Sequence, residues 1–286
     1  MMDNKNSFIK PYLKWAGGKR QLLSEIKKHL PKDIDHYTYY EPFIGAGAVF
    51  FNLQPQKAVI NDFNEQLILT YIAIKNDLMN LVKLLSYHKE NISEEYYYEL
   101  RDIDRDAEKF NNLTNTEKAA RLIFLNKTCY NGLYRVNSKG FFNVPYGKHK
   151  NPAVYDEKIL THISDYLNSN KIKILNMDFE EAVCTTCKDS FIYFDPPYHS
   201  PQKNNFTDYH KNGFNETDQK RLRDLLIKMT EKNIKCLLSN SDTEYIRKLY
   251  QSDYFNIIPV KAKRLINSVH DARGKVDEVL IKNWKD

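Results

Sequence analysis

One stretch of the chain reads Phe191-Ile192-Tyr193-Phe194-Asp195-Pro196-Pro197-Tyr198, an apolar run that ends on a carboxylate, two prolines and an aromatic ring. The apolar residues are typical of a buried strand, and the prolines end it because they fix φ and lack a backbone N–H. At such a strand end Asp195 and the Pro196 carbonyl can accept hydrogen bonds from a flat amine, and Tyr198 can stack on a planar ring. The alternative is a strand that simply stops at the prolines, with Asp195 as a turn residue.

A glycine-rich turn follows an earlier apolar stretch and reads Phe43-Ile44-Gly45-Ala46-Gly47. Because glycine has no Cβ, Gly45 and Gly47 allow the backbone to lie against a ligand. Phe50 stands where a dinucleotide-binding fingerprint has its third glycine, so a simple tight turn is the alternative for this motif alone. Asp62 ends the next apolar stretch, where a carboxylate can accept both hydroxyls of a ribose. Together the two motifs indicate a nucleoside-like ligand.

These motifs stand in the same order as in the DNA adenine-N6 methyltransferases of the Dam type, and the chain resembles that family. The segment Lys14-Trp15-Ala16-Gly17-Gly18-Lys19 and the segment from Tyr130 to Gly147 also carry the resemblance, which spans about Pro11 to Trp284. Within the family the chain looks similar to the GATC-specific, DpnM-like methylases of restriction-modification systems.

The resemblance implies an enzyme, a site-specific adenine DNA methyltransferase that moves a methyl group from S-adenosyl-L-methionine to N6 of a flipped adenine in duplex DNA, within GATC. An adenine amino group is a poor nucleophile because its lone pair is delocalised into the ring. Asp195 and the Pro196 carbonyl would each accept one N6 hydrogen and so localise that pair. Tyr198 would stack on the extruded base and offset part of the cost of flipping. These three residues are the expected catalytic residues, and the chemistry requires neither a metal nor a covalent intermediate.

The cofactor implied by the resemblance is S-adenosyl-L-methionine. Its expected binding residues are Trp15, Lys19, Phe43, Gly45, Gly47, Asp62, Asp178, Phe179 and Asp195. Two of these residues have a structural alternative. Trp15 could anchor an N-terminal loop in the core, and Asp178 could N-cap the helix that follows it.

The resemblance also implies a DNA-recognition hairpin. Its expected DNA-binding residues are Tyr130, Asn131, Leu133, Arg135, Asn137, Pro145 and Lys148. Arg135 would read a guanine through a bidentate contact, which is worth about 1 to 3 kcal/mol of discrimination. Leu133 and Pro145 would contact bases, while Tyr130 and Asn131 would insert where the adenine departs.

Cations and aromatic rings alternate in this part of the chain, and no acid separates Arg135 from Lys150. This pattern suits phosphates and bases, although a solvated hairpin is the alternative. The family often has an arginine where Lys148 stands. Because lysine lacks the planar fork of arginine, we expect Lys148 to contact a phosphate.

The pattern of apolar runs and amphipathic segments predicts an α/β fold, a mostly parallel sheet covered by helices. The expected strands are Tyr39–Glu41, Ala58–Asn61, Ile172–Met177, Phe191–Asp195, Cys236–Ser239, Phe255–Val260 and Val276–Lys282. The expected helices of this part are Gln21–His29, Gly47–Phe51, Glu65–Tyr87, Thr217–Glu231 and Thr243–Tyr250.

An interruption of this alternation predicts an insertion between the second and third strands. Helical patterns lie at Glu94–Arg105, Glu117–Lys127 and Asp156–Leu167, and a hairpin is expected from Leu133–Val136 and Phe141–Val144. With the resemblance, this gives a Rossmann-like S-adenosyl-L-methionine-dependent methyltransferase sheet, residues 1–75 and 171–286, and an inserted helical DNA-recognition domain with a β-hairpin, residues 76–170.

Composition narrows the class of protein. The chain has 286 residues and a net charge of +6, which allows a polyanionic partner without requiring one. No run of apolar residues is long enough to span a membrane, and Met1 to Lys10 is too polar for a secretory signal, so we expect a cytoplasmic protein. Four cysteines do not predict a disulfide framework in a chain of this length. Cys184 and Cys187 form a C-x-x-C pair without the further ligands of a zinc site, and are expected in a helix.

The expected partner is double-stranded DNA, and the protein is expected to be a monomer without membrane association, with a cognate restriction endonuclease encoded nearby as a further possible partner. Two alternatives stay open. One is a methyltransferase for another planar amine, on RNA adenine or protein glutamine; Asp195 and the large insertion favour DNA over it. The other is a noncatalytic DNA-binding relative, against which the intact motifs argue.

Overall fold

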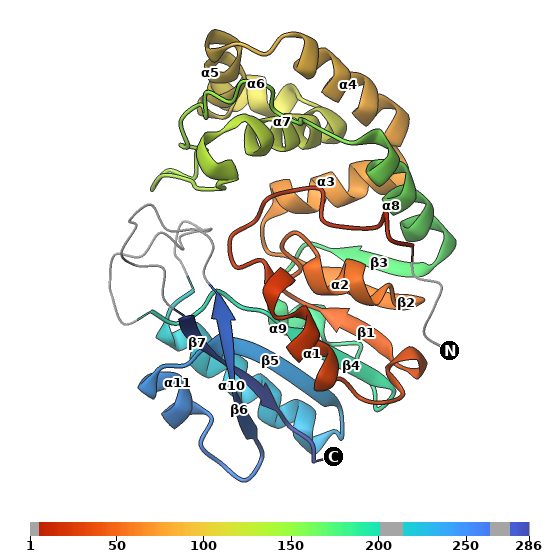
Figure 1. Cartoon of the computed structure of the whole chain (residues 1–286), viewed down its shortest axis with the longest axis vertical. Coiled ribbons are helices and arrows are strands. Elements are labelled where there is room, and N and C mark those ends of the chain that lie inside the picture. The colour runs from red at the N-terminus through yellow and green to blue at the C-terminus, as the bar shows by residue number, and fades with distance from the viewer. Residues whose placement is uncertain (1–5, 201–213, 264–274, 286) are drawn as a thin grey trace.

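The computed structural model describes residues 6–200, 214–263 and 275–285. Within these residues a seven-stranded sheet fills the lower part of the molecule in Figure 1, in the order β3-β2-β1-β4-β5-β7-β6. Its strands are β1 (Thr38–Glu41), β2 (Lys57–Asn61), β3 (Lys171–Leu175), β4 (Ser190–Phe194), β5 (Lys235–Ser241), β6 (Asn256–Lys263) and β7 (Lys275–Lys282). β1 to β5 pair in parallel, whereas β7 pairs antiparallel with β5 and β6. The mostly parallel sheet expected from the sequence is confirmed.

Alternate side chains of the strands feed two hydrophobic cores. Tyr39 and Tyr193 belong to one core, and Tyr40 and Phe194 belong to the other. Because successive strand residues point to opposite faces, the two cores lie on the two sides of the sheet. Every residue of β4 is buried, which explains why this central strand reads as a continuous apolar run.

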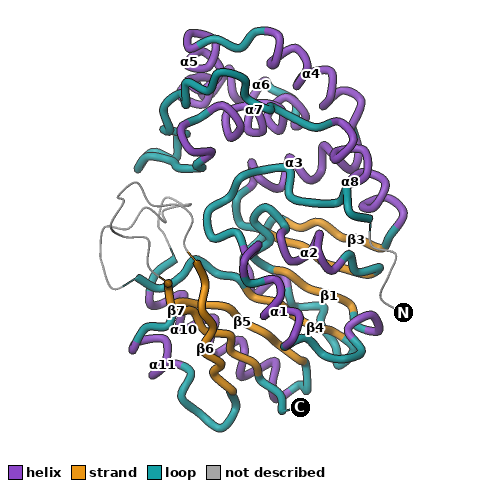
Figure 2. Tube along the Cα trace, in the orientation of Figure 1, coloured by secondary structure: helices purple, strands orange, loops and turns teal. Residues whose placement is uncertain are grey.

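Helices cover both faces of the sheet and also form a separate layer above it (Figure 2). In chain order the helices before that layer are η1 (Lys19–Gln21), α1 (Leu23–Lys28), η2 (Ile34–His36), α2 (Ala48–Leu53) and α3 (Glu65–Asn76). The next are α4 (Leu78–Glu90), α5 (Glu94–Asp102), η3 (Ile103–Arg105), α6 (Ala107–Asn112), α7 (Asn115–Thr128), η4 (Tyr130–Gly132) and α8 (Glu157–Ser169). The last are α9 (Phe179–Ala182), α10 (Glu216–Glu231) and α11 (Glu244–Leu249).

The chain between β2 and β3 builds the upper layer of Figure 1. α4 to α7 lie there, and α3 joins them to the sheet because it packs against α7, α8 and β3. β2 and β3 are paired neighbours, so the chain leaves and re-enters the sheet at adjacent strands. An insertion at this point therefore does not disturb the strand order.

Two helix predictions differ from the structure. The single helix expected from Glu65 to Tyr87 is two helices, α3 and α4, which are separated at Asp77 (φ −146°, ψ 43°). The carboxylate of Asp77 accepts hydrogen bonds from Asn80 and, at 2.6 Å, from Thr116 of α7. A tertiary contact thus breaks a continuous amphipathic pattern. The short helix α6 was not expected.

The expected hairpin is present as a turn, but its arms are not regular strands. The turn is closed by Gly140 N–H, which donates to the Asn137 carbonyl at 2.8 Å, and a single bridge joins Val136 to Phe142. The arms do not extend into a ladder because side chains take their backbone groups. Phe142 N–H donates to Asp104, and the Val144 carbonyl accepts from the Tyr97 hydroxyl.

The cysteines are all free, and their positions correct one expectation. Cys184 and Cys187 are exposed and lie in the turn after α9, not in a helix; the four-residue α9 ends at Ala182. Cys129 and Cys236 are buried. Over the described ranges no three His, Cys, Asp or Glu side chains gather as a metal site would require. None of the helices in those ranges combines the length and apolar character needed to cross a bilayer.

Candidate active site

Lys19 and Asp195 form an ion pair at the carboxyl end of β4. Lys19 Nζ lies 2.8 Å from Asp195 Oδ1, and the two side chains are 5% and 18% exposed. The ammonium also donates to the Gly17 carbonyl at 2.6 Å. Ser239, on the neighbouring strand β5, donates its hydroxyl to the same carboxylate oxygen at 3.0 Å. Two motifs at opposite ends of the chain therefore meet at one carboxylate.

Charge at this strand end is balanced by burial and by neighbouring groups. Burial raises the pKa of Asp195, while Lys19 and the Ser239 hydroxyl act to lower it. Glu41, at the end of the adjacent strand β1, is 2% exposed, and burial raises its pKa well above the usual range. The Tyr39 hydroxyl donates to Glu41 at 2.6 Å and offsets only part of that effect. The arrangement favours a neutral Glu41 beside an ionised Asp195.

Tyr198 closes the site on the side of β7. Its hydroxyl donates to Glu278 Oε2 at 2.7 Å, and Lys19 Nζ lies 4.5 Å from its ring centroid. Burial and then the charge of Asp195 raise its pKa well above the usual range, so the phenol remains a neutral donor. These contacts fix the plane of the ring.

The backbone after β4 is held from behind by two buried amides. Gln219 of α10 donates to the Pro197 carbonyl at 3.0 Å and accepts from Asn240 of β5 at 3.0 Å. Asn240 in turn accepts the His199 N–H at 3.1 Å. Gln219 and Asn240 are 1% and 0% exposed. Because each amide oxygen and nitrogen has a partner, the loop from Asp195 to His199 has a defined conformation.

The glycine-rich turn lies against Asp62. Gly45 has φ +50° and donates its N–H to Asp62 Oδ2 at 3.0 Å. A Cβ on Gly45 would lie 3.1 Å from Trp15 Cδ1, and a Cβ on Gly47 (φ +74°) would lie 2.8 Å from the Tyr71 hydroxyl. A side chain at either position would be strained, which explains both glycines.

Asp62 is a half-buried carboxylate that can accept further hydrogen bonds. Its second oxygen accepts the Asn64 N–H at 3.0 Å, and burial raises its pKa to about 6. Each carboxylate oxygen has two lone pairs, so Asp62 can accept two further hydroxyl groups.

An aromatic group lies beside this turn. Phe43 packs on Phe179 with ring centroids 5.3 Å apart, and Phe214 meets Phe43 edge-on at 5.6 Å. Arg221 of α10 contacts both Phe179 and Asp178. Its guanidinium carbon lies 4.8 Å from the Phe179 ring centroid, and it donates to Asp178 at 2.9 Å. The flat surface of these rings suits a planar base.

Asp178 is the N-cap of α9, which was the structural alternative to a role in cofactor binding. Its carboxylate accepts the Glu180 N–H at 3.0 Å and caps α9. Trp15 also packs as an anchor would, since it stacks on Tyr134 at 4.9 Å and contacts Gly45. Neither contact excludes a ligand. Trp15 borders the glycine-rich turn, and Asp178 is next to Phe179 in the chain.

The expected recognition residues lie on one loop, residues 130–148. Tyr130 is 51% exposed, and its N–H donates to the Pro145 carbonyl at 2.9 Å, so these two residues are neighbours. Asn131 is exposed with φ +57°, whereas Leu133 packs on the core. Arg135 Nε donates to Asn143 Oδ1 at 2.7 Å, which fixes the plane of the guanidinium.

Asn137 and Lys148 differ in whether their side chains form hydrogen bonds within the loop. Asn137 Oδ1 accepts the N–H groups of Lys139 and Phe141, so this side chain builds the turn. Lys148 has φ +50°, is 75% exposed, and lies 3.6 Å from Glu94. Its amine is therefore at the surface, at the end of the loop.

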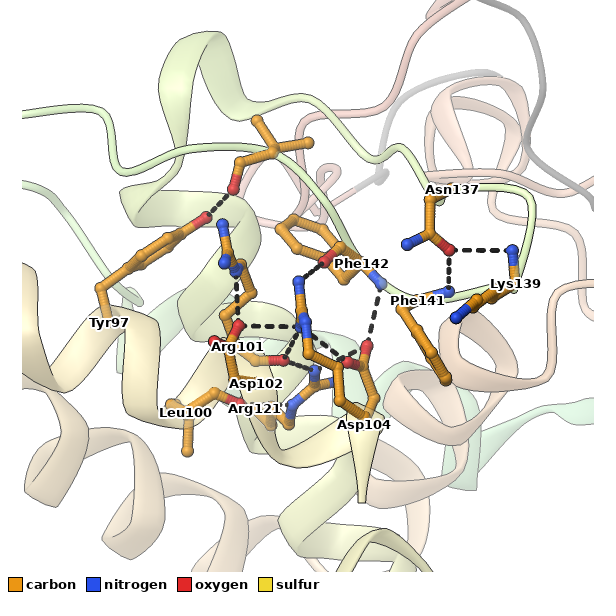
Figure 3. A network of polar contacts seen from close by, with 12 residues as sticks. Tyr97, Leu100, Arg101, Asp102, Asp104, Arg121, Asn137, Lys139, Phe141 and Phe142 are labelled. Carbon is orange, nitrogen blue, oxygen red and sulfur yellow. Dashed lines mark hydrogen bonds and ion pairs between the residues drawn. The ribbon is translucent and has the colours of Figure 1, made fainter. Parts of the chain in front are cut away.

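A buried ion pair supports the loop from the helical layer (Figure 3). Arg121 Nη2 lies 2.9 Å from Asp104 Oδ2, and the side chains are 1% and 5% exposed. The same carboxylate accepts the Phe142 N–H at 2.9 Å, and Arg121 also donates to the Leu100 carbonyl at 2.7 Å. The loop is thus bonded to α5, η3 and α7 through one network.

Several residues of the site were not predicted from the sequence. These are Glu41, Ser239, Asn240, Gln219, Arg221 and Glu278. One signal was available: Ser239 and Asn240 interrupt an apolar strand, and polar side chains in such strands need partners. The partners themselves depend on which strands are adjacent, which the sequence did not reveal.

Comparison with known proteins identifies the family. The family model for D12 class N6 adenine-specific DNA methyltransferases matches residues 15–266. A Type II methyltransferase, M1.LlaDCHI, of Lactococcus lactis subsp. cremoris is 44% identical over 277 residues, 96% of both chains. M.MjaIII, a Type II methyltransferase of Methanocaldococcus jannaschii, is 44% identical over 293 residues, 96% of this chain and 99% of its own.

More distant relatives carry a different name. The DNA adenine methylase of Escherichia coli K12 is 34% identical over 273 residues, 94% of this chain and 93% of its own. Among solved structures, a precorrin 8W decarboxylase from Methanobacterium thermoautotrophicum aligns with 87% of this chain and 82% of its own, with a TM-score of 0.32 and 10% identity, too little to bear on the fold. The family model covers most of the chain, and both groups of relatives match it over nearly their whole length, so this chain belongs to the D12 class of N6 adenine-specific DNA methyltransferases.

Proposed function

We propose that this enzyme transfers the methyl group of S-adenosyl-L-methionine to N6 of an adenine flipped out of duplex DNA, at Asp195, Pro196 and Tyr198. Family membership gives DNA adenine methylation; the cofactor, the residues and the site are our assignment. The observation that carries it is the buried carboxylate of Asp195, paired with Lys19 at 2.8 Å beside a rigid diproline and a fixed aromatic ring.

The residues around the glycine-rich turn fit S-adenosyl-L-methionine. Gly45 and Gly47 have φ +50° and +74° and form a tight turn without side chains, to which we assign the methionine part of the cofactor. Asp62 has the acceptor capacity for two ribose hydroxyls, and Phe43 with Phe179 offers a flat surface to the adenine. Trp15 borders the same turn, and Lys19 lies at Asp195. When bound, the cofactor supplies an electrophilic methyl group on a positive sulfur.

Asp195 and Pro196 prepare the nucleophile. Lys19 and Ser239 both contact Oδ1 of Asp195, so we assign Oδ2 to one N6 hydrogen and the Pro196 carbonyl to the other. Accepting both hydrogens localises the nitrogen lone pair and stabilises the positive charge that develops on the amine. Alignment of the nitrogen with the methyl group adds a proximity effect that reaches about 7 to 11 kcal/mol in favourable cases.

We assign residues 76–170 as a DNA-recognition domain inserted into a catalytic domain of residues 1–75 and 171–286. The position of the loop supports this, because it adjoins the site through Trp15 and is held by the helical layer. Arg135 would read a guanine, Leu133 and Pro145 would contact bases, and Tyr130 with Asn131 would fill the place of the flipped adenine. Asn137 shapes the turn, and Lys148 contacts a phosphate. We propose GATC as the target.

The wider role follows the nearer relatives, whose names are those of Type II methyltransferases. We propose that the enzyme acts as a monomer and protects DNA from a cognate restriction endonuclease encoded nearby. Digestion of DNA from cells with and without the gene, using nucleases that cut only unmethylated GATC, tests this role.

One experiment tests the function directly. The purified protein is incubated with radiolabelled S-adenosyl-L-methionine and, in parallel, with duplex DNA, RNA and a protein extract, and the methylated DNA is then sequenced for modified adenines. We expect label in DNA alone, at the adenine of GATC. Label in RNA or protein, or DNA binding without transfer, would support the alternative functions instead.

A further inference from the structure

Tyr134 is a residue of the recognition loop, and its ring packs on Trp15 beside the glycine-rich turn. Its side chain is 7% exposed, and its ring stacks on the Trp15 indole with centroids 4.9 Å apart and planes inclined by 25°. Phe142, from the other arm of the loop, meets the same ring edge-on at 5.8 Å. The Tyr134 ring therefore lies between Phe142 of the loop and Trp15 near the start of the chain.

Trp15 carries this contact to the cofactor side. The position of a Cβ on Gly45 would be 3.1 Å from the indole, so Trp15 packs directly on this glycine. Gly45 N–H donates to Asp62 Oδ2 at 3.0 Å. A shift of the indole would consequently move the backbone that holds the proposed ribose-binding carboxylate.

A second arm leads from the same tyrosine to the same carboxylate. The Asn64 side chain acts on the Tyr134 hydroxyl and opposes the rise in its pKa that burial causes, and the Asn64 N–H donates to Asp62 Oδ1 at 3.0 Å. Asn64 is itself fixed, since its side chain accepts the Leu67 N–H and caps α3. Each oxygen of Asp62 is thus joined to Tyr134 by a separate route.

Asn126 fastens the loop to the chain segment before Trp15. It is fully buried, accepts the Lys14 N–H at 3.0 Å, and donates to the Lys14 carbonyl at 2.8 Å and the Gly132 carbonyl at 3.1 Å. Lys14 and the loop are therefore bonded to the same side chain, and Trp15 is the next residue along the chain.

We propose that Tyr134 is a positioning residue that couples DNA binding to cofactor binding, through Trp15 on one side and Asn64 on the other. The inference rests on the proposed function. A loop held in place by bound DNA fixes Tyr134 and with it both oxygens of Asp62, and a ribose held by Asp62 stabilises the loop in return. Coupling between two binding sites is reciprocal, so each ligand must raise the affinity for the other by the same factor.

The test measures the affinity of the full chain for a fluorescent duplex containing GATC, with and without saturating S-adenosylhomocysteine, which cannot donate a methyl group. The ratio of the two affinities is the coupling factor. We expect a factor of about ten in the wild type, within the usual range for coupled sites, and about one in Tyr134→Leu. Tyr134→Phe keeps the stack on Trp15 and loses the hydroxyl, so its factor should lie between these values.

Tyr97→Phe is the matched control. The Tyr97 hydroxyl donates to the Val144 carbonyl of the same loop at 2.8 Å. This variant should weaken duplex binding equally with and without S-adenosylhomocysteine and leave the coupling factor unchanged. A role of Tyr134 that is only structural would likewise lower both affinities and preserve their ratio. Thermal unfolding of each variant shows whether it is folded at the assay temperature. If Tyr134→Leu is unfolded there, Tyr134→Phe still provides the test.

The outcomes separate the inference from the function on which it rests. If the wild type binds both ligands with a factor of one, or if the Tyr134 variants keep the wild-type factor, the coupling role is overturned and the proposed function stands. If the wild type binds neither S-adenosylhomocysteine nor the duplex, both fall. A loss of coupling confined to the Tyr134 variants supports the inference.

Discussion

Asp195 is a carboxylate on whose charge burial and a neighbouring cation act in opposite directions. Burial raises its pKa, and the Lys19 ammonium at 2.8 Å opposes that effect. A hydrogen-bond acceptor for an amine must be ionised to work well, because a protonated carboxyl offers a donor in place of one acceptor. Lys19 is therefore as important to the proposed chemistry as the carboxylate itself.

Asp195→Asn should lower kcat about 10²- to 10³-fold, the usual cost of losing one such charge-stabilising group. The amide keeps the size of the side chain but removes its charge. The measurement is single-turnover methyl transfer to duplex DNA. Asp189→Asn, the same change at an exposed residue before β4, is the control and should leave kcat unchanged. A near-normal rate in Asp195→Asn would rule out the assigned role.

Asp62 gives a prediction about pH. Burial raises its pKa to about 6, so the folded, ligand-free enzyme loses this negative charge as the pH falls through that value. A protonated Asp62 accepts ribose hydroxyls poorly. We expect the affinity for S-adenosylhomocysteine, measured by calorimetry, to weaken below that pKa in the wild type, and to be low and independent of pH in Asp62→Asn. The same pH dependence in the variant would assign the titration to another group.

The stability of the free enzyme should respond in the opposite sense. A carboxyl whose pKa is raised by folding stabilises the folded state only while it is protonated, so its contribution is lost as the pH rises through about 6. The free energy of unfolding of the wild type, measured in urea, should therefore fall as the pH rises through about 6, and this pH dependence should be absent in Asp62→Asn, whose amide does not titrate. A binding residue that costs stability is expected to be there for its ligand.

At the scale of single residues, the proposed reacting groups could be chosen from the sequence, whereas their contacts with one another could not. Asp195, Gly45 and Asp62 belong to local motifs, whose chemistry can be read from adjacent letters. The contact of Lys19 with Asp195 joins residues far apart in the chain, and it exists only once the sheet has brought η1 to the end of β4. Arg221 was missed for the same reason.

The recognition loop is an element whose shape is determined by side chains more than by strand pairing. Arg135 is the clearest case, since its guanidinium is held in one plane by Asn143 Oδ1 at 2.7 Å and by the Asn143 carbonyl at 3.3 Å. A guanidinium fixed in this way presents its remaining N–H groups in a defined direction, which favours bidentate contact with a base.

Arg135→Ala should relax sequence choice more than it weakens nonspecific binding. The loss of one bidentate contact is worth about 1 to 3 kcal/mol at a single position of the target. The measurement compares affinities for duplexes that carry GATC or one changed base pair. Lys139→Ala, at the exposed tip of the same turn, is the control. Equal loss on all sequences would show that Arg135 contacts phosphate.

Asp104→Asn should destabilise the helical layer and the loop together. It removes one partner of a buried ion pair with Arg121 and weakens the acceptor for Phe142 N–H, and breaking such a pair costs about 3 to 5 kcal/mol. The free energy of unfolding in urea measures this. Asp102→Asn serves as the control, because Asp102 is 46% exposed and its ion pairs should be worth at most about 1 kcal/mol.

At the scale of elements, the strands were predictable and the irregular parts were not. Most strands of the parallel sheet are apolar runs with a polar end, and the edge strand β3 alternates lysine with isoleucine; neither pattern needs tertiary information. The break at Asp77 depends on Thr116 of another helix, and the arms of the loop lose their ladder to Asp104 and Tyr97. The local pattern cannot reveal these competing partners. For this reason the helix expected from Glu65 to Tyr87 was predicted too long, and the arms of the loop were predicted as paired strands.

The whole molecule is organised by the alternation of side chains on the sheet, and this was available in the sequence. Two cores require two layers of helices, and the helical segment between β2 and β3 was expected from the interruption in the pattern. Strand order was not available. It places β1 between β2 and β4, and so brings Asp62, Gly45 and Asp195 to one edge of the sheet.

Burial across the molecule predicts the reactivity of its thiols. Cys184 and Cys187 are exposed, whereas Cys129 and Cys236 are buried in different cores, and burial raises the pKa of Cys129 to about 12. A thiol reagent should therefore label the exposed pair quickly in the native protein and all four cysteines after unfolding in urea. Rapid labelling of four thiols in the native state would contradict the packing of both cores.

Lys19 pairs with Asp195, and burial favours a neutral Glu41, so the unpaired negative charge near the proposed donor site is that of Asp62, which is assigned to the ribose and not to the sulfur. A pocket of this kind has little electrostatic means to prefer a positive sulfonium over the uncharged thioether that remains after transfer. The spent donor should therefore compete strongly with the fresh one, and the enzyme should be subject to product inhibition. Its pace inside a cell would then depend on whichever reaction clears the thioether, as much as on its encounter with DNA.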